Sequence, residues 1–332
     1  MTENMDLTDT RTDSDPLDAL YDRAYAAFNG GELQLASTLF AELIEASPPG
    51  NHLHYMRGLT HKYLLDWRTS LEHNLQAQQL EDEFNEASAW NAGIAATALG
   101  NWSEARRQWA RCGINIPEGE GPIERDFGLI SVRLNPWGKG ETVFARRIDV
   151  VRARLLNVPL PESGHRLFDI VLHDGAPTGE RRSGKGTVPV FNALQTLQAS
   201  DHRTYTAFVR SPSAEAMSEL LDMELPGVGY VEDWTASVVT LCLRCSYGVP
   251  HVGAAANTAH EVGAASNDDW RIERNLGIGA QGKAAVERLL ANWVAAGPDR
   301  YIDGIETREQ PNPVPEDGHV WWEAPTDSRA DG

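Results

Sequence analysis

Residues 18–48 read DALYDRAYAAFNGGELQLASTLFAELIEASP, and two later segments follow the same pattern. They are LHYMRGLTHKYLLDWRTSLEHNLQAQQLED at 53–82 and ASAWNAGIAATALGNWSEARRQWARCGINIP at 87–117. A small residue stands in the middle of each first half, at Ala24, Gly58 and Gly93, so the offsets between copies are 34 and 35 residues. A period of this length indicates a helical solenoid, in which each unit buries its apolar face by stacking on the next.

Further positions keep the same register. They are a turn (Gly31, Asp66, Gly100), a small residue (Ala36, Ser70, Ala105) and a residue four positions later (Phe40, Asn74, Trp109), with Pro48 and Pro117 closing copies one and three. These residues resemble the tetratricopeptide repeat (TPR), a helix–turn–helix unit of about 34 residues. Copy two departs from the family pattern, because Asn74 replaces the aromatic residue and Asp82 the closing proline.

The resemblance implies that the first helix of each unit lines a concave groove that receives a peptide. Carried over by position, the groove residues are Tyr21, Tyr25 and Phe28 of copy one, His52, Tyr55, Leu59, Lys62 and Tyr63 of copy two, and Trp90 and Ile94 of copy three. Tyr and Trp favour binding surfaces, although several of these rings could instead pack against the following domain. The basic clamp of chaperone-binding arrays is absent at the matching positions, Tyr21, Tyr25, Met56, Ala87 and Asn91, which argues against a chaperone co-factor.

The rest of the chain divides by composition. Residues 1–17 predict a disordered acidic arm, 18–118 the repeats, 126–305 an α+β domain, and 309–332 an acidic, Pro-rich tail with Trp321 and Trp322 as an anchor. Between the repeats and the domain, Pro117–Pro122 predicts a linker. The fold class is therefore a helical, TPR-like solenoid of three repeats followed by a mixed α+β domain.

Short apolar runs between Gly and Pro predict the elements of the second domain. The expected strands are Leu129–Leu134, Thr142–Val151, Ala153–Val158, Phe168–His173, Val188–Phe191, Tyr205–Val209 and Val228–Val231, and the expected helices are Ser213–Met223 and Lys283–Ala296. Gly277–Ala284 resembles a phosphate-binding loop, but Ala284 replaces the hydroxyl residue that would hold magnesium. A glycine-rich entry to the last helix is the simpler interpretation.

Charge and composition exclude several classes of function. The formal net charge of −19 argues against nucleic acid and anionic membranes as partners. The net charge of residues 133–185 is positive, with ten Lys and Arg against six acids. This segment predicts either a basic face for an acidic partner or a solvated strand face. The N-terminus lacks the pattern of a signal peptide, and no apolar run approaches the length of a membrane span. A cytoplasmic protein is expected.

A metal-like stretch lies at 242–260. Cys242 and Cys245 are three residues apart and can face one ion, His251 can supply a third ligand, and His260 a fourth. Four such ligands would form a closed, structural zinc site. A redox pair or two buried thiols remain alternative interpretations.

These observations favour protein binding as the function, with a partner protein or peptide held in the aromatic groove or at the domain junction. A specific version is an intracellular neutraliser of a basic toxin, whose association a charge of −19 would steer. The alternative is an enzyme that uses His165, His173 and Asp174 of the second domain, with the repeats as a targeting module. Against it, His173-Asp174-Gly175 also fits a strand followed by a turn.

Overall fold

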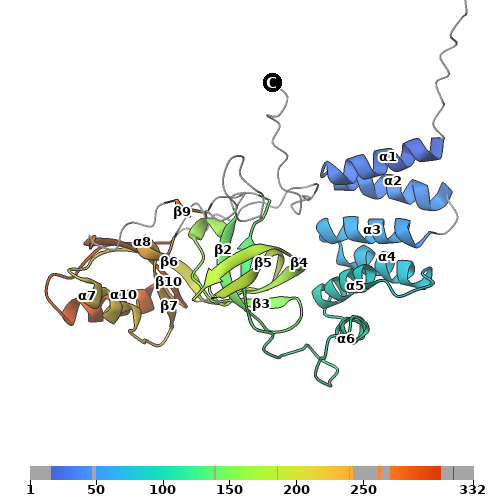
Figure 1. Cartoon of the computed structure of the whole chain (residues 1–332). Coiled ribbons are helices and arrows are strands. Elements are labelled where there is room, and N and C mark those ends of the chain that lie inside the picture. Colours follow the sequence, from blue (N-terminus) through green and yellow to red (C-terminus); the bar gives the residue numbers. More distant parts are fainter. Residues whose placement is uncertain are drawn as a thin grey trace, which may run out of the picture.

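The structure, a computed structural model, describes residues 16–46, 50–137, 140–184, 186–238, 240–241, 261–262, 270–307 and Asp317. Figure 1 shows three parts in a row: a helical array, a β-barrel and a second sheet with two helices. The predicted fold class, TPR-like helical repeats followed by an α+β region, is confirmed. Within the described ranges, no helix combines the length and the apolar character that crossing a membrane requires.

The array consists of three helix–turn–helix units. Their helices are α1 (Pro16–Asn29), α2 (Leu33–Ala46), α3 (Asn51–Tyr63), α4 (Trp67–Gln79), α5 (Glu86–Ala98) and α6 (Trp102–Arg111). Side chains cap three of the helix starts, because Asp66, Asn85 and Asn101 accept hydrogen bonds from backbone N–H groups of the first turn. The repeat pattern read from the sequence thus gives the correct helices in the correct order.

The small residues of the repeat let the two helices of a unit approach closely. A Cβ added at Gly93 would lie 2.5 Å from the ring of Trp109, and one added at Gly58 would lie 2.5 Å from Nδ2 of Asn74. Asn74 is therefore the structural replacement for the aromatic residue of the other copies. Asn74 Nδ2 donates to the Ser70 carbonyl at 2.8 Å, whereas the buried Asn74 Oδ1 has no hydrogen-bond partner among the described residues.

The turn of each unit uses a left-handed residue. Gly31 and Gly100 have φ values of 82° and 67°, and the equivalent residue of copy two is Leu65, with φ 58°. The sequence alignment placed Asp66 at this position, one residue late, because no glycine marked it. Asp66 instead begins α4, where its side chain accepts from Thr69 N.

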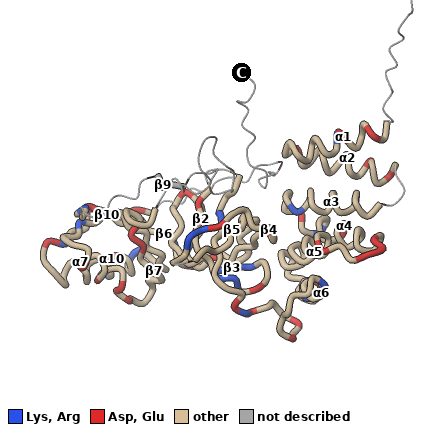
Figure 2. Tube along the Cα trace, in the orientation of Figure 1, with Lys and Arg blue, Asp and Glu red and all other residues tan. Residues whose placement is uncertain are grey.

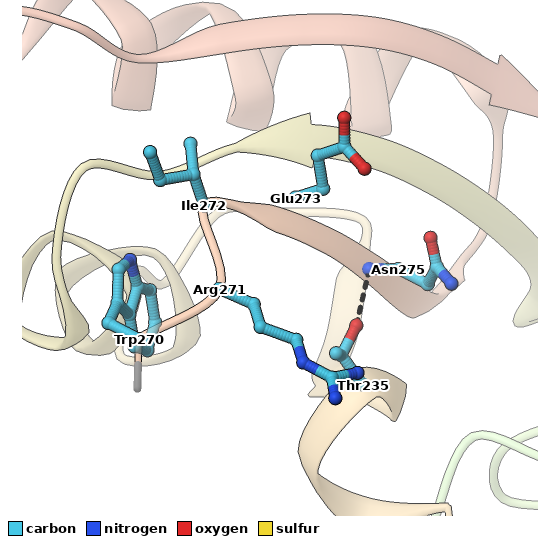
Figure 3. A pocket seen from close by; sticks show the side chains of 6 residues that line it. All are labelled: Thr235, Trp270, Arg271, Ile272, Glu273 and Asn275. Carbon is cyan, nitrogen blue, oxygen red and sulfur yellow. Dashed lines mark hydrogen bonds between the residues drawn. The ribbon is translucent and has the colours of Figure 1, made fainter. Parts of the chain in front are cut away.

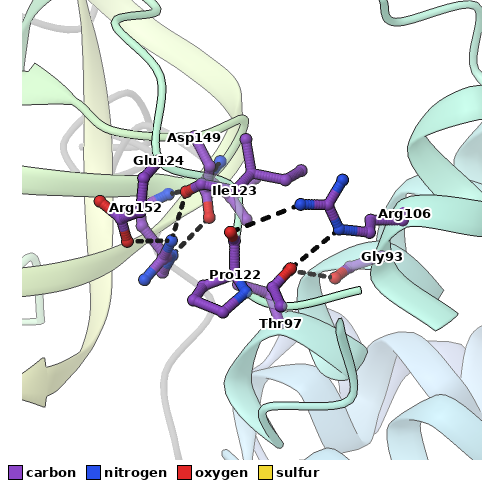
Figure 4. A network of polar contacts seen from close by, with 10 residues as sticks. Gly93, Thr97, Arg106, Pro122, Ile123, Glu124, Asp149 and Arg152 are labelled. Atoms are coloured by element: carbon purple, nitrogen blue, oxygen red, sulfur yellow. Dashed lines mark hydrogen bonds and ion pairs between the residues drawn. The ribbon is translucent and has the colours of Figure 1, made fainter. Parts of the chain in front are cut away.

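The segment that joins the array to the barrel is held by two arginines (Figure 4). Arg106 of α6 donates to the carbonyls of Pro117, Gly121 and Pro122 at 2.6, 2.8 and 3.4 Å. Arg152 donates to the Ile123 carbonyl at 2.6 Å and pairs with acidic side chains of Glu124 and Asp149. The predicted linker is therefore a fixed part of the fold.

Five strands form a closed barrel in the order β1-β2-β3-β4-β5. They are β1 (Leu129–Leu134), β2 (Glu141–Arg147), β3 (Arg152–Leu155), β4 (Ile170–Ser183) and β5 (Gly186–Gln198). Neighbours are antiparallel except β1 and β5, which close the barrel in parallel with Val132 opposite Phe191. A short 3-10 helix, η1 (Pro161–Ser163), lies in the connection from β3 to β4.

The second sheet has the order β11-β6-β10-β7. Its elements follow the chain as β6 (Arg203–Arg210), α7 (Ala214–Leu221), β7 (Val228–Asp233), β10 (Glu273–Ala280), α10 (Lys283–Ala295) and β11 (Tyr301–Glu306). This β-α-β-β-α-β succession is the ferredoxin-like arrangement. A short helix α8 (Trp234–Ser237) follows β7, and β8 (Thr240–Leu241) pairs with β9 (Glu261–Val262). The region predicted as one α+β domain thus contains two distinct sheets.

Strand β10 was not predicted, because its glycines and charges hid the strand pattern. Leu276, Ile278 and Ala280 point into the core under α7 and α10. Gly277 and Gly279 face the other way, where an added Cβ would lie 2.2 Å from Trp234 and 2.5 Å from Leu167. The phosphate-loop interpretation of these glycines is wrong, since they lie within a strand and admit bulky side chains to its surface.

We expect Gly58→Ala to destabilise the array. Although alanine favours a helix by about 1 kcal/mol over glycine, its Cβ would press on Asn74 and on the backbone of α4. Overpacking of this kind costs about 1–3 kcal/mol. Thermal unfolding followed by circular dichroism measures the loss. Gly121→Ala is the matched control, because nothing lies within 4 Å of its added Cβ; equal melting of both variants would contradict the close helix contact.

Candidate protein-binding surface

The predicted groove residues lie on α1, α3 and α5, whose common side we call the first-helix face. Six of them are accessible to different degrees, His52 being exposed and the others half-buried: Tyr21, Tyr25, His52, Tyr55, Leu59 and Trp90. The remaining four are buried: Phe28, Lys62, Tyr63 and Ile94. The face therefore has an occupied part and an open part.

The barrel occupies the part of the face near the end of α3. The Lys62 ammonium lies 3.0 and 3.2 Å from the two carboxylate oxygens of Asp174 in β4. The Tyr63 hydroxyl donates to Asp174 Oδ2 at 2.8 Å, and Gly175 N donates to Oδ1 at 2.7 Å. Lys62 and Asp174 are only 3% and 7% exposed. A carboxylate of this chain thus fills a position that a partner peptide was expected to reach.

Apolar contacts extend this junction. The ring of Trp90 lies 2.9 Å from the position of a Cβ on Gly175, so only glycine lets β4 lie on the ring. Trp67 Nε1 donates to Gln195 Oε1 of β5 at 2.6 Å. Leu172 and Leu194 belong to the core of the repeats, while their neighbours Val171 and Ala193 fill the barrel. Strands β4 and β5 therefore serve two cores at once through their alternating side chains.

The buried polar groups at the junction shift one another's pKa. Burial opposes ionisation of Asp174, but Lys62, the Tyr63 hydroxyl and Gly175 N outweigh it and hold the pKa of the carboxyl below its usual value. Burial and then the charge of Asp174 raise the pKa of Tyr63 well above its usual value. The junction is thus an ionised carboxylate held by one cation and one neutral hydroxyl.

The open part of the first-helix face lies on the first two repeats. Tyr25 and His52 stack with ring centroids 5.9 Å apart and an interplanar angle of 11°, and the Tyr25 hydroxyl hydrogen-bonds to His52 Nε2. Burial, together with the nearby Tyr21 and Tyr55, raises the pKa of Tyr25 to about 12. These four rings, the open aromatic surface, provide flat apolar area with polar edges, which suits a peptide or protein segment.

His165, His173 and Asp174, the residues of the enzymatic alternative, each contact other groups of the fold. His173 Nδ1 lies 2.7 Å from the main-chain oxygen of Asp174, and not on its carboxylate, which Lys62 and Tyr63 engage. His165 Nδ1 lies 3.2 Å from Thr196 Oγ1. An enzyme of this kind would need a histidine base oriented by the Asp174 carboxylate, and neither histidine contacts that carboxylate.

The four predicted zinc ligands, Cys242, Cys245, His251 and His260, lie outside the described residues. Among the residues that are described, no group of three or more His, Cys, Asp or Glu could hold a metal ion. The structural zinc site stays a prediction.

The structure adds a shallow pocket that the sequence did not indicate (Figure 3). It has a volume of about 570 Å³ and is lined by Thr235, Trp270, Arg271, Ile272, Glu273 and Asn275. Asn275 N donates to Thr235 Oγ1 at 2.7 Å across it. Its lining combines a positive charge, a negative charge and one exposed isoleucine. These residues do not indicate a particular class of ligand.

Several arginines of the basic segment at 133–185 make hydrogen bonds inside the fold, while Arg146, Arg154 and Arg182 are exposed. Figure 2 shows Lys and Arg around the barrel strands, whereas Asp and Glu mark the loop between α4 and α5. Arg133 donates to Asn192 and Thr178, Arg181 to Ser131 and the Thr142 carbonyl, and Arg152 holds the linker. These arginines satisfy buried acceptors, so the sequence count overstates the basic surface.

No family model and no curated relative matches this chain. Similar solved structures include the second TPR of Spaghetti (RPAP3) bound to the HSP90 peptide SRMEEVD, at 20% identity and a TM-score of 0.27. Another is the TPR2B domain of yeast Sti1 in a complex with pHsp70, at 12% identity and a TM-score of 0.27. Each covers 29% of this chain, in the helical array, and 88% and 76% respectively of its own. The assignment of the repeats rests on their own helix–turn–helix geometry.

We expect Asp174→Ala to be strongly destabilising, because it leaves the Lys62 ammonium buried without its carboxylate. Breaking a buried pair from one side costs about 3–5 kcal/mol. Urea unfolding measures this cost. The double variant Lys62→Met with Asp174→Leu should recover most of it, since no lone charge remains.

Asp126→Ala is the control for this experiment. Its partner Arg146 lies at 2.7 Å, but the two side chains are 61% and 49% exposed, so solvent screens the pair and the loss of stability should be much smaller than for Asp174→Ala. If Asp174→Ala unfolds like Asp126→Ala, the junction does not depend on the buried pair.

Stability should fall as the pH drops from 6.5 towards 4. Burial lowers the pKa of His173 to about 4, so the folded chain keeps the ring neutral while the unfolded chain protonates it near 6.5. The stability is fully present above 6.5 and decreases by about 3 kcal/mol at pH 4 through this group. His73 and His165, whose pKa values burial also lowers to about 4, act in the same direction.

His173→Leu should reduce the loss of stability between pH 6.5 and 4, because the contribution of this one histidine is removed. Thermal unfolding between pH 4 and 7 measures it, with the exposed His52→Gln as the control. A variant with the full wild-type slope would show that His173 does not titrate as a buried neutral ring.

Proposed function

We propose that this chain is a protein-binding protein whose open aromatic surface receives a segment of a partner protein or peptide. The observation that supports it is the stacked pair of Tyr25 and His52, flanked by Tyr21 and Tyr55, which the barrel leaves accessible. Aromatic side chains lose little conformational entropy on binding and dominate many interfaces.

The occupied part of the face supports a rigid role for the second and third repeats. Because Lys62, Tyr63 and Trp90 are engaged by β4, a partner on the first two repeats would meet a surface fixed by the barrel. Pre-organised surfaces bind more tightly, since less order is lost on association. A partner could also touch the edge of the barrel beside α3.

A narrower version of the proposal is neutralisation of a basic toxin. Its support is the net charge of −19 and the acidic loop between α4 and α5, with Glu81, Asp82 and Glu83. Association with a basic partner would then slow as salt rises, because steering between opposite charges is screened.

The test is affinity capture by the full chain from extracts of the cells that produce it, followed by titration of the purified partner. Tyr25→Ala should weaken binding at least tenfold, since a central aromatic anchor contributes about 2 kcal/mol. Phe84→Ala is the matched control, because Phe84 is 51% exposed but lies in the loop between α4 and α5. If the affinity for the partner is unchanged by Tyr25→Ala, the binding site lies elsewhere on the chain.

A further inference from the structure

The described residue farthest along the chain contacts the first repeat. Asp317 Oδ1 accepts a hydrogen bond of 2.7 Å from the backbone N–H of Gln34, in the first turn of α2. The N–H groups at a helix start have no partner inside the helix and carry partial positive charge. The first turn of α2 has no acidic residue of its own. A residue 283 positions away supplies the missing carboxylate.

This contact places Asp317 near the open aromatic surface. Gln34 and Tyr25 lie on the two arms of the α1–α2 hairpin, each within two turns of the bend at Gly31. With a rise of 1.5 Å per residue and a helix spacing of 8–10 Å, their Cα atoms are separated by roughly 10 Å. Trp321, four residues beyond Asp317, can reach about 14 Å in an extended chain. Trp321 and Trp322 are therefore within reach of the Tyr25–His52 pair.

We propose that residues 318–332 of this chain bind back on its own open aromatic surface, with Asp317 as the anchor on α2 and the Trp321–Trp322 pair against Tyr25 and His52. The inference rests on the proposed function, because it names a ligand of the same surface that competes with a partner. The chemistry is that of aromatic stacking beside polar ring edges. The tail lowers the affinity for partners by keeping the surface occupied.

A peptide assay on the full chain tests this. The probe is a fluorescein-labelled synthetic peptide of residues 316–332, titrated by fluorescence anisotropy into wild type and into a tail variant, Trp321→Ala with Trp322→Ala. The tail variant should bind the peptide at least tenfold more tightly than wild type. The attached tail competes at an effective concentration in the millimolar range, and the substitutions weaken that competitor.

Two further substitutions locate the contact. In the tail variant, Tyr25→Ala should reduce peptide affinity at least tenfold, while Phe84→Ala, on the far loop, should leave it unchanged. In the otherwise wild-type chain, Asp317→Asn should raise peptide affinity several-fold, because the weakened anchor releases the tail more often.

Several results would overturn the inference: no binding to the tail variant, equal affinity for wild type and tail variant, or binding that ignores Tyr25→Ala. Concentration-dependent dimers of wild type that disappear in the tail variant would also overturn it, since the tail would then reach a second copy. The proposed function fails separately. If the tail variant captures a protein through Tyr25 but does not bind the peptide, the inference about the tail is wrong and the proposed function stands. If the tail variant binds the peptide through Tyr25 but captures no protein, the inference stands and the proposed function is wrong.

Discussion

The ion pair between Lys62 and Asp174 is the constraint on which the arrangement of the molecule depends. Its two charges are almost fully buried, and a third group, the Tyr63 hydroxyl, completes the coordination of the carboxylate. Such a pair is tolerated inside a protein only with good geometry and no unpaired partner. It therefore fixes the barrel at one position on the array, and the apolar contacts of Trp90, Leu172 and Leu194 follow from that position.

The junction of array and barrel and the junction of barrel and second sheet share one feature: a glycine packs against a large side chain of the neighbouring part. At the first junction Gly175 of β4 lies under Trp90, and at the second Gly279 of β10 lies under Leu167. Polar contacts add to the second junction, where Glu232 of β7 accepts from Asn157 Nδ2 at 3.1 Å and from Val158 N at 3.1 Å. Array, barrel and second sheet are thus joined by packed surfaces as well as by connecting segments.

The sequence predicted the repeats well, because the pairs of Gly58 with Asn74 and Gly93 with Trp109 express a contact that recurs at a fixed spacing. It missed β10, where glycine and charge replace the alternation expected of a strand, and it missed β11. It identified Lys62, Tyr63 and Trp90 as residues of one face. It could not show that β4 covers them, with Asp174 on Lys62 and Tyr63 and with Gly175 on Trp90. Periodic local signals are visible in one chain, whereas a single long-range pair leaves no pattern.

The long separation of Lys62 from Asp174 has a consequence for synthesis on the ribosome. The two residues are 112 positions apart, and chains grow by about 5–20 residues per second, so the carboxylate follows the ammonium by roughly 6–20 s. Helical repeats form within microseconds to milliseconds. The last helix of the array ends at Arg111, 63 residues before Asp174, so the complete array precedes the carboxylate by roughly 3–13 s. During that time the nascent array can fold with Lys62, Tyr63 and Trp90 uncovered, and it exposes more of the first-helix face than the finished protein does.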